Sequence, residues 1–278
     1  MMPRMTSFEL DAELAPPGPS EFSPLDSGLW LPSGAPITRR LMLGSILAGA
    51  GALTVGAPES EAAKPIALVY RGPASSPGTA EAAVRALGHR GALTPRYVGP
   101  RERTRLTAAA LRGATLYVQP GGGSVYAAWP HMRPYRRTIV NWVHGGGHYL
   151  GLCLGAYLAA DDPGFGLWPG EIGDYKRTRG TDIPTARGRL ATIRWRGRGR
   201  TMYVEDAPVL TPPRRHRRLS VLAHYRSGHI AAASIPVGRG RVTIIGPHPE
   251  APPSWYRGGP RRWQPGAWID TERTSVAA

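Results

Sequence analysis

The sequence predicts an α/β fold with a mainly parallel sheet, helices on both faces of that sheet and an antiparallel C-terminal section. Between residues 64 and 160, short apolar runs alternate with longer stretches of helical periodicity, which is the pattern of repeated strand–helix units. After residue 164, strand-like runs follow one another with only Arg, Gly and Pro turns between them. A strand–helix part followed by a strand–strand part predicts a parallel sheet that continues with antiparallel strands.

The individual elements follow in chain order. Buried strands are expected where short apolar runs occur, at residues 65–70, 95–98, 114–118 and 149–152. Helices are expected where apolar residues recur every three or four positions, at residues 78–89, 102–111, 133–143 and 155–160. The later strands are expected at residues 190–195, 201–204, 220–223, 230–235 and 242–245.

Length and composition indicate one well-packed domain with tails. The chain has 278 residues, of which 41% are hydrophobic, which is enough for one sizeable core. The 36 glycines and 29 prolines indicate many loops. We therefore expect a leader over residues 1–63, a folded domain over residues 64–258 and a loose C-terminal tail over residues 259–278.

The charge is strongly positive and unevenly spread. The formal net charge is +16, and arginine supplies 33 of the 35 basic residues. Residues 1–63 hold three basic and seven acidic residues, so the rest of the chain carries a net charge of +20. The electric field of so positive a domain attracts polyanions, and an anionic envelope polymer is one expected partner. The alternative interpretation is an arginine-rich surface that is simply solvated. No aromatic ladder accompanies the arginines, so specific nucleic-acid binding is not expected.

The leader has the features of an export signal. Arg39 and Arg40 precede an apolar, glycine-rich run over residues 41–55 that is short for a permanent membrane helix. This pattern fits a twin-arginine signal peptide, with cleavage after Ala57 or Ala62. We therefore expect an extracellular or cell-envelope protein that touches the membrane only if the signal stays uncleaved. An internal buried helix is the other interpretation of this run.

Cys153, the only cysteine, lies between an expected strand and an expected helix in the sequence Gly-Leu-Cys-Leu-Gly. A nucleophile elbow has this arrangement, since small neighbours let the strand turn sharply into the helix. The positive end of the helix favours the thiolate form, so we expect a partly exposed, reactive thiol. The amide of Leu154 would face a developing oxyanion. A buried structural cysteine is the alternative.

His248 and Glu250 follow the last expected strand in the sequence Gly-Pro-His-Pro-Glu. A cysteine nucleophile needs an imidazole to take its proton, and the imidazole needs a third group to fix its tautomer. In an extended segment, residues two positions apart face the same side, so Glu250 can stand behind His248. A solvated loop with an incidental His and Glu is the alternative. No histidine pair has metal-ligand spacing with a carboxylate, so we expect neither a metal nor a cofactor.

Gly121, Gly122 and Gly123 follow the third expected strand. Backbone without side chains can approach a substrate closely, and the amide of Gly122 could supply a second oxyanion-hole donor. We also expect Gly121, Gly123 and Tyr157 to line the substrate pocket. An ordinary glycine turn is the alternative for this segment.

Taken together, Pro-Gly-Gly after a strand, Gly-x-Cys-x-Gly at an elbow and a late His-Pro-Glu resemble the class I glutamine amidotransferase-like superfamily. The sequences of residues 117–123, 141–147, 149–157 and 238–250 resemble the biotin-protein ligase N-terminal domain family more closely. The resemblance covers about residues 64–256. It implies a three-layer, flavodoxin-like sheet with Cys153 as nucleophile, His248 as base and Glu250 as its partner. It also implies that the amides of Gly122 and Leu154 bind the oxyanion.

The chain departs from the amidotransferase pattern at Ala156-Tyr157, where glutamine amidotransferases usually continue Gly-x-Gln. Within these 278 residues we also expect no synthase domain to receive ammonia, and too few residues remain outside the amidotransferase-like region for an adenylating domain. We therefore expect a hydrolase that cleaves an amide or γ-glutamyl-like bond of a small molecule or peptide through a thioester. The alternative function is a catalytically silent binding module of the cell envelope.

Overall fold

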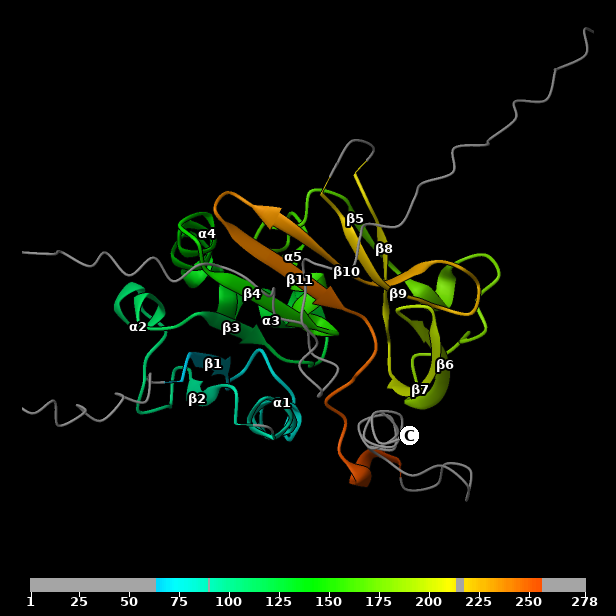
Figure 1. Cartoon of the computed structure of the whole chain (residues 1–278), viewed down its shortest axis with the longest axis horizontal. Helices are drawn as coiled ribbons and strands as arrows, with labels where there is room; N and C mark the ends of the chain where they lie inside the picture. Colours follow the sequence, from blue (N-terminus) through cyan, green and yellow to red (C-terminus); the bar gives the residue numbers. More distant parts are fainter. Residues whose placement is uncertain (1–63, 90, 214–217, 257–278) are drawn as a thin grey trace, which may run out of the picture.

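The computed structural model describes residues 64–89, 91–213 and 218–256, which form one 11-stranded sheet with helices packed on it (Figure 1). The main path of the sheet is β2-β1-β3-β4-β11-β10-β9-β6-β7, while β8 pairs with β10 and β5. The first five strands of this path are parallel, and the pairs beyond β11 are antiparallel. The predicted mixed α/β fold, parallel first and antiparallel towards the C-terminus, is confirmed.

The parallel strands are short and mostly buried, as the apolar runs predict: β1 (Ile66–Tyr70), β2 (Thr94–Val98), β3 (Leu116–Gln119), β4 (His148–Leu152) and β11 (Gly240–Ile245). β2 forms an edge of the sheet and is the least buried of them, which is why it tolerates Pro95. β3 is buried at all four positions because it lies between β1 and β4. The carboxyl ends of β3, β4 and β11 lie side by side, because β4 pairs in parallel with both β3 and β11.

Helices lie on both sides of the parallel strands: α1 (Thr79–Gly88), α2 (Ala108–Arg112), α3 (Val125–Met132), α4 (Arg136–His144) and α5 (Leu154–Ala159). Leu87 of α1 packs in one core cluster with Val69 of β1, whereas Val143 of α4 packs in a second cluster with Leu68. Adjacent strand residues thus face opposite sides, and α1 and α4 cover different faces (Figure 1).

The antiparallel part consists of β5 (Glu171–Asp174), β6 (Arg189–Trp195), β7 (Arg198–Val204), β8 (Pro208–Thr211), β9 (Ser220–His224) and β10 (Ile230–Val237). β6 and β7 form a hairpin whose turn residues Arg196 and Gly197 both have positive φ, as tight hairpin turns require. Met202 of β7 joins the core cluster that contains Leu87. The hairpin therefore packs on the same side of the molecule as α1. Single-turn 3-10 helices cover Arg133–Tyr135, Tyr175–Arg177 and Pro253–Tyr256.

Several elements differ from the sequence-based prediction. α3 was not predicted because Pro130 lies inside it, although the Ser124 hydroxyl caps it by accepting from the Tyr126 amide at 3.2 Å. α2 begins only at Ala108, where the preceding Thr107 is its N-cap. β5 and β8 were also not predicted, because each has four residues and they pair chiefly with one another. Non-local pairing rather than local apolar pattern defines these two strands.

The leader at residues 1–63, with its expected signal, and the expected tail at residues 259–278 lie outside the described residues. So does the arginine-rich segment at residues 214–217. Among the helices of the described ranges, none combines the length and the apolar character that crossing a membrane requires.

Candidate active site

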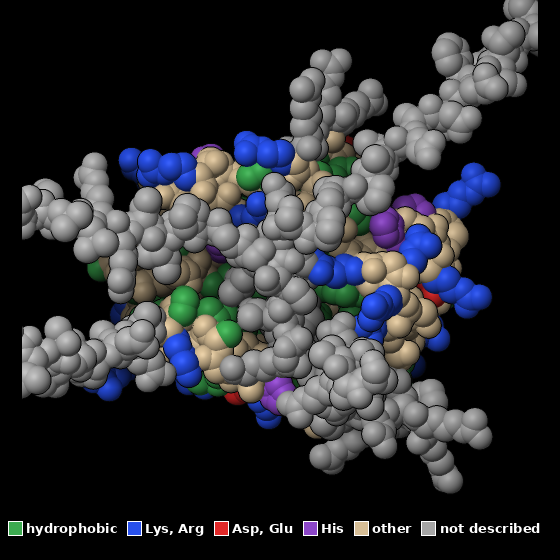
Figure 2. Space-filling view, in the orientation of Figure 1, with side chains coloured by type: hydrophobic (Ala, Val, Ile, Leu, Met, Phe, Trp, Pro, Cys, Tyr) green, Lys and Arg blue, Asp and Glu red, His purple; other side chains and the backbone are tan. Residues whose placement is uncertain are grey.

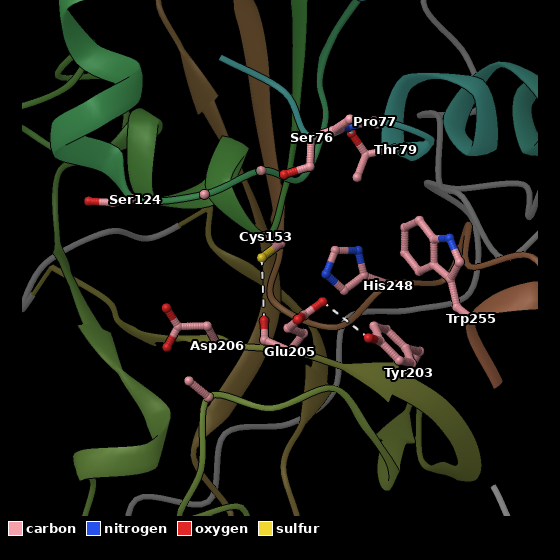
Figure 3. A pocket seen from close by; sticks show the side chains of 13 residues that line it. Ser76, Pro77, Thr79, Ser124, Cys153, Tyr203, Glu205, Asp206, His248 and Trp255 are labelled. Atoms are coloured by element: carbon pink, nitrogen blue, oxygen red, sulfur yellow. Dashed lines mark hydrogen bonds between the residues drawn. The ribbon is translucent and has the colours of Figure 1, made fainter. Parts of the chain in front are cut away.

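A cavity of about 510 Å³ lies at the carboxyl edge of the parallel strands (Figure 3). Three of its lining residues, Gly122, Cys153 and His248, follow β3, β4 and β11 respectively. The carboxyl ends of neighbouring parallel strands meet at one edge, where open α/β sheets bind ligands. The parallel sheet therefore brings together residues that are up to 126 positions apart in the sequence.

Cys153 lies in a sharp turn between β4 and α5. Its φ of 48° and ψ of −103° are unusual for a residue with a side chain, so the backbone is strained at the sulfur. The flanking glycines make the turn possible. A Cβ on Gly151 would lie 2.3 Å from the Gly155 oxygen, and one on Gly155 would lie 2.1 Å from the Gln119 oxygen. The expected strand–turn–helix arrangement is present.

The thiol of Cys153 is more enclosed than expected, because the residue is only 5% exposed. The expectation of a partly exposed thiol is thus corrected. The thiol is enclosed because the end of β7 lies beside the elbow, which the sequence did not predict. The Sγ atom donates a hydrogen bond to the carbonyl oxygen of Glu205, the residue that follows β7, at 3.5 Å. The sulfur nevertheless lines the cavity, so a ligand can reach it from there.

His248 and Glu250 form a buried pair behind Cys153. The Nδ1 atom of His248 lies 2.9 Å from the Oε1 atom of Glu250, and the two side chains are 4% and 0% exposed. The amide of His248 donates to the Tyr203 carbonyl oxygen at 2.8 Å, which ties the segment after β11 to β7. Among the described residues, the Oε2 atom of Glu250 has no hydrogen-bond partner. His248 is therefore the main group that compensates the negative charge of the buried Glu250 carboxylate.

The pKa of His248 reflects these neighbours. Burial by itself lowers the pKa of the imidazole, but the charges of Glu250 and Cys153 and hydrogen bonds to both raise it well above its usual value. A carboxylate can only accept a hydrogen bond, so Nδ1 carries a proton and faces Glu250. The other ring nitrogen, Nε2, is then the atom that can exchange a proton with the thiol.

Residues from four other segments complete the cavity. Ser76, Pro77 and Thr79, at the start of α1, line one side together with Gly123 and Ser124. Tyr203, Glu205 and Asp206 lie on the opposite side (Figure 3), and Ala186 and Trp255 also line the cavity. No local pattern in the sequence predicts these residues as part of the site. The available signal was Glu205-Asp206, an acidic pair at a strand end in a chain with only 19 acidic residues.

Two residues expected in the pocket, Gly121 and Tyr157, are not among the residues that line the cavity. Gly121 packs against the His248 ring, where an added Cβ would come 2.8 Å from Cε1. Tyr157 points to the β7 end and donates to the Asp206 carbonyl oxygen at 3.2 Å. Gly123 lines the cavity, and the Glu250 carboxylate lies next to His248 Nδ1. Over residues 64–89, 91–213 and 218–256, no three His, Cys, Asp or Glu side chains come together as metal ligands.

Comparison with known proteins finds similarity to solved structures at low identity. A putative GMP synthase subunit from Thermoplasma acidophilum has a TM-score of 0.48 at 11% identity, covering 77% of this chain and 98% of its own. A cytoplasmic protein from Salmonella typhimurium LT2 has a TM-score of 0.45 at 13% identity, covering 76% and 98%. The exo-β-1,4-mannosidase Op5Man5 from Opitutaceae bacterium strain TAV5 has a TM-score of 0.46 at 14% identity, covering 76%.

The region similar to the mannosidase is 36% of that enzyme's length, so this chain spans about a third of it. No curated protein sequence matches the chain. A family model does match: residues 66–168, from β1 through the Cys153 elbow to Trp168, are similar to the family described as "Biotin-protein ligase, N terminal".

Proposed function

We propose that this protein is an exported cysteine hydrolase that cleaves an amide or γ-glutamyl-like bond. The observation that carries the proposal is the arrangement of Cys153, His248 and Glu250. The sulfur lies at a strained turn on the cavity surface, and the imidazole beside it is hydrogen-bonded to a buried carboxylate at 2.9 Å. A cysteine nucleophile is activated by an adjacent base, and a third group can orient that base, which is the arrangement found here.

In the proposed reaction, the Cys153 thiolate attacks the substrate carbonyl carbon. The imidazolium of His248 then donates its proton to the departing amine as the carbon–nitrogen bond breaks, which leaves a thioester and a free amine. His248 next takes a proton from water, which attacks the thioester and releases a carboxylic acid, so that the Cys153 thiolate and the His248 imidazolium are restored. Overall, one amide and one water give one acid and one amine. Glu250 keeps the imidazole oriented throughout.

The backbone after β3 supports an oxyanion hole made by the amides of Gly122 and Leu154. A Cβ on Gly122 would lie only 2.5 Å from the Leu154 Cδ2 atom, so the two residues are close neighbours beside the sulfur. The strand order β2-β1-β3-β4-β11 is also that of flavodoxin-like sheets, which supports the three-layer assignment within the glutamine amidotransferase-like superfamily.

A catalytically silent binding module is the second candidate. Two observations favour it: the enclosure of Cys153, and Tyr157, which holds the β7 end where amidotransferases usually have a glutamine. In this case the cavity would bind a ligand of the envelope without cleaving it.

The test uses the full chain with γ-glutamyl and aminoacyl p-nitroanilides. We expect release of p-nitroaniline from at least one of them, and hydroxylamine should trap the thioester as a hydroxamate. Cys153→Ala should abolish both signals while keeping the fold, as judged by circular dichroism. Release that persists in Cys153→Ala would contradict the cysteine mechanism. Absence of release from the whole panel, together with an unreactive Cys153, would favour the binding module.

Export is a separate part of the proposal and rests on Arg39 and Arg40 before an apolar run. We expect that replacing both by lysine blocks export, because the twin-arginine pathway reads the arginine pair itself. Fractionation of expressing cells should show the wild-type protein outside the cytoplasm and the double variant inside it. Equal amounts of both proteins outside would contradict this route.

A further inference from the structure

We propose that Glu205 binds a cationic amine of the substrate. The site would then select amides whose acyl portion carries a free ammonium group close to the scissile carbonyl. This inference rests on the proposed function and adds the substrate class. The charges that line the cavity differ in sign from the net charge of the protein as a whole.

The protein is strongly basic, and Lys and Arg side chains are spread over the face seen in Figure 2 with few acidic ones among them. The cavity lining contains no lysine or arginine among the described residues, but it contains Glu205 and Asp206. A site for an anionic substrate would be expected to draw on the abundant arginines. The composition of this lining instead favours a neutral or cationic ligand.

The two carboxylates are not equivalent. Asp206 pairs with Lys176, which also contacts Asp174 at 3.0 Å, so its charge is compensated within the protein. Glu205 forms no ion pair with any residue that the structure describes, and its carboxylate accepts from the Tyr203 hydroxyl at 3.1 Å. Glu205 therefore offers a negative charge that a ligand could neutralise.

The position of Glu205 places this charge next to the reacting group. Its own carbonyl oxygen accepts from the Cys153 sulfur at 3.5 Å, and its carboxylate points towards the space beside Cys153 and His248 (Figure 3). A cation bound there would lie within a few bonds of a carbonyl carbon attacked by Cys153. The α-ammonium group of an amino acid or peptide has such a spacing.

The aromatic rings near Glu205 also favour a ligand with an ammonium group. The Tyr203 and Trp255 rings have centroids 5.4 Å apart and both line the cavity. The faces of such rings attract ammonium groups, and the attraction grows where water is excluded. The phenol of Tyr203 stays protonated because burial and the Glu205 carboxylate raise its pKa to about 12. Tyr203 thus remains a hydrogen-bond donor that holds the carboxylate in place.

The test uses the single cysteine as a reporter of local charge. Three methanethiosulfonate reagents carry a trimethylammonium, a sulfonate or only a methyl group. Each reacts when the Cys153 thiolate attacks the reagent sulfur, so that a disulfide forms and methanesulfinate departs. Rates are measured on the full chain by intact mass at about 0.15 M salt, where surface charges beyond about 8 Å are screened.

We expect the cationic reagent to react faster than the anionic one in the wild type, although the protein is basic. Glu205→Gln should lower the cation-to-anion rate ratio roughly tenfold, and dividing each rate by the neutral reagent's rate removes any change in the reactivity of the thiol itself. The matched control is Glu171→Gln, which removes an exposed carboxylate on β5 outside the cavity lining and should leave the ratio unchanged.

A ratio that does not respond to Glu205→Gln would overturn the inference. Equal changes in all three rates would be such a result, because Glu205 would then act on the thiol rather than on a ligand. The proposed hydrolase function is tested separately in the same assay, since it requires the neutral rate to fall in His248→Ala. The two failures are therefore distinguishable.

Discussion

Glu250→Gln is expected to slow alkylation of Cys153 by iodoacetamide at neutral pH by on the order of tenfold or more. The carboxylate accepts a hydrogen bond from His248 Nδ1 at 2.9 Å and stabilises the imidazolium. A glutamine amide can present its NH₂ group to Nδ1, which favours the wrong tautomer and removes the negative charge. A lower pKa of His248 leaves less imidazolium to stabilise the Cys153 thiolate. A fall of one pH unit in that pKa reduces the thiolate population by up to about tenfold.

The sole cysteine makes the measurement unambiguous, because intact mass reports only Cys153. Glu171→Gln again serves as the control for a lost carboxylate. An unchanged alkylation rate in Glu250→Gln, with a reduced rate in His248→Ala, would show that the site is a Cys–His dyad and that Glu250 has no part in it.

His248→Ala is expected to destabilise the fold by about 3 kcal/mol at pH 7. The substitution leaves the buried Glu250 carboxylate without its partner, and its second oxygen already has none among the described residues. Breaking a buried pair on one side costs about 3–5 kcal/mol. Adding Glu250→Gln to His248→Ala should recover part of the loss, because the uncompensated charge is then gone. Urea unfolding followed by circular dichroism measures both.

The same pair predicts how stability depends on pH. The folded pKa of His248 lies above its unfolded value of about 6.5, so its contribution is fully present below that pH. The contribution is lost as pH rises through the folded value. We expect the free energy of unfolding of the wild type to fall at alkaline pH and the double variant to lack this part of the decline. A double variant that is less stable than His248→Ala would contradict the charge argument.

The sequence predicted the parts of this structure that depend on local pattern. The strands before Cys153 and His248 are short apolar runs. Glycine is required on both sides of Cys153, because a Cβ added at Gly151 or Gly155 would lie only 2.1 to 2.3 Å from a backbone oxygen atom. The i, i+2 spacing of His248 and Glu250 placed both side chains on one side, as the 2.9 Å contact shows. These features were predictable because each depends on few neighbouring residues.

The opposite wall of the cavity was not predictable in this way. Tyr203, Glu205 and Asp206 reach the site because β7 ends beside the segment after β11, through a single antiparallel bridge between Tyr203 and His248. That bridge joins residues 45 positions apart, and no periodicity in the sequence marks it. The enclosure of Cys153 follows from the same contact. Tyr157 was misplaced because it faces Asp206, a neighbour that this bridge brings near.

The most direct test of the central claim is a double-mutant cycle on Cys153 alkylation with His248→Ala and Glu250→Gln. The claim is that Cys153, His248 and Glu250 act as one unit. Members of one unit are strongly non-additive, so the double variant should react at the rate of His248→Ala alone. Independent, multiplying effects of the two substitutions, or no effect of either, would contradict the triad.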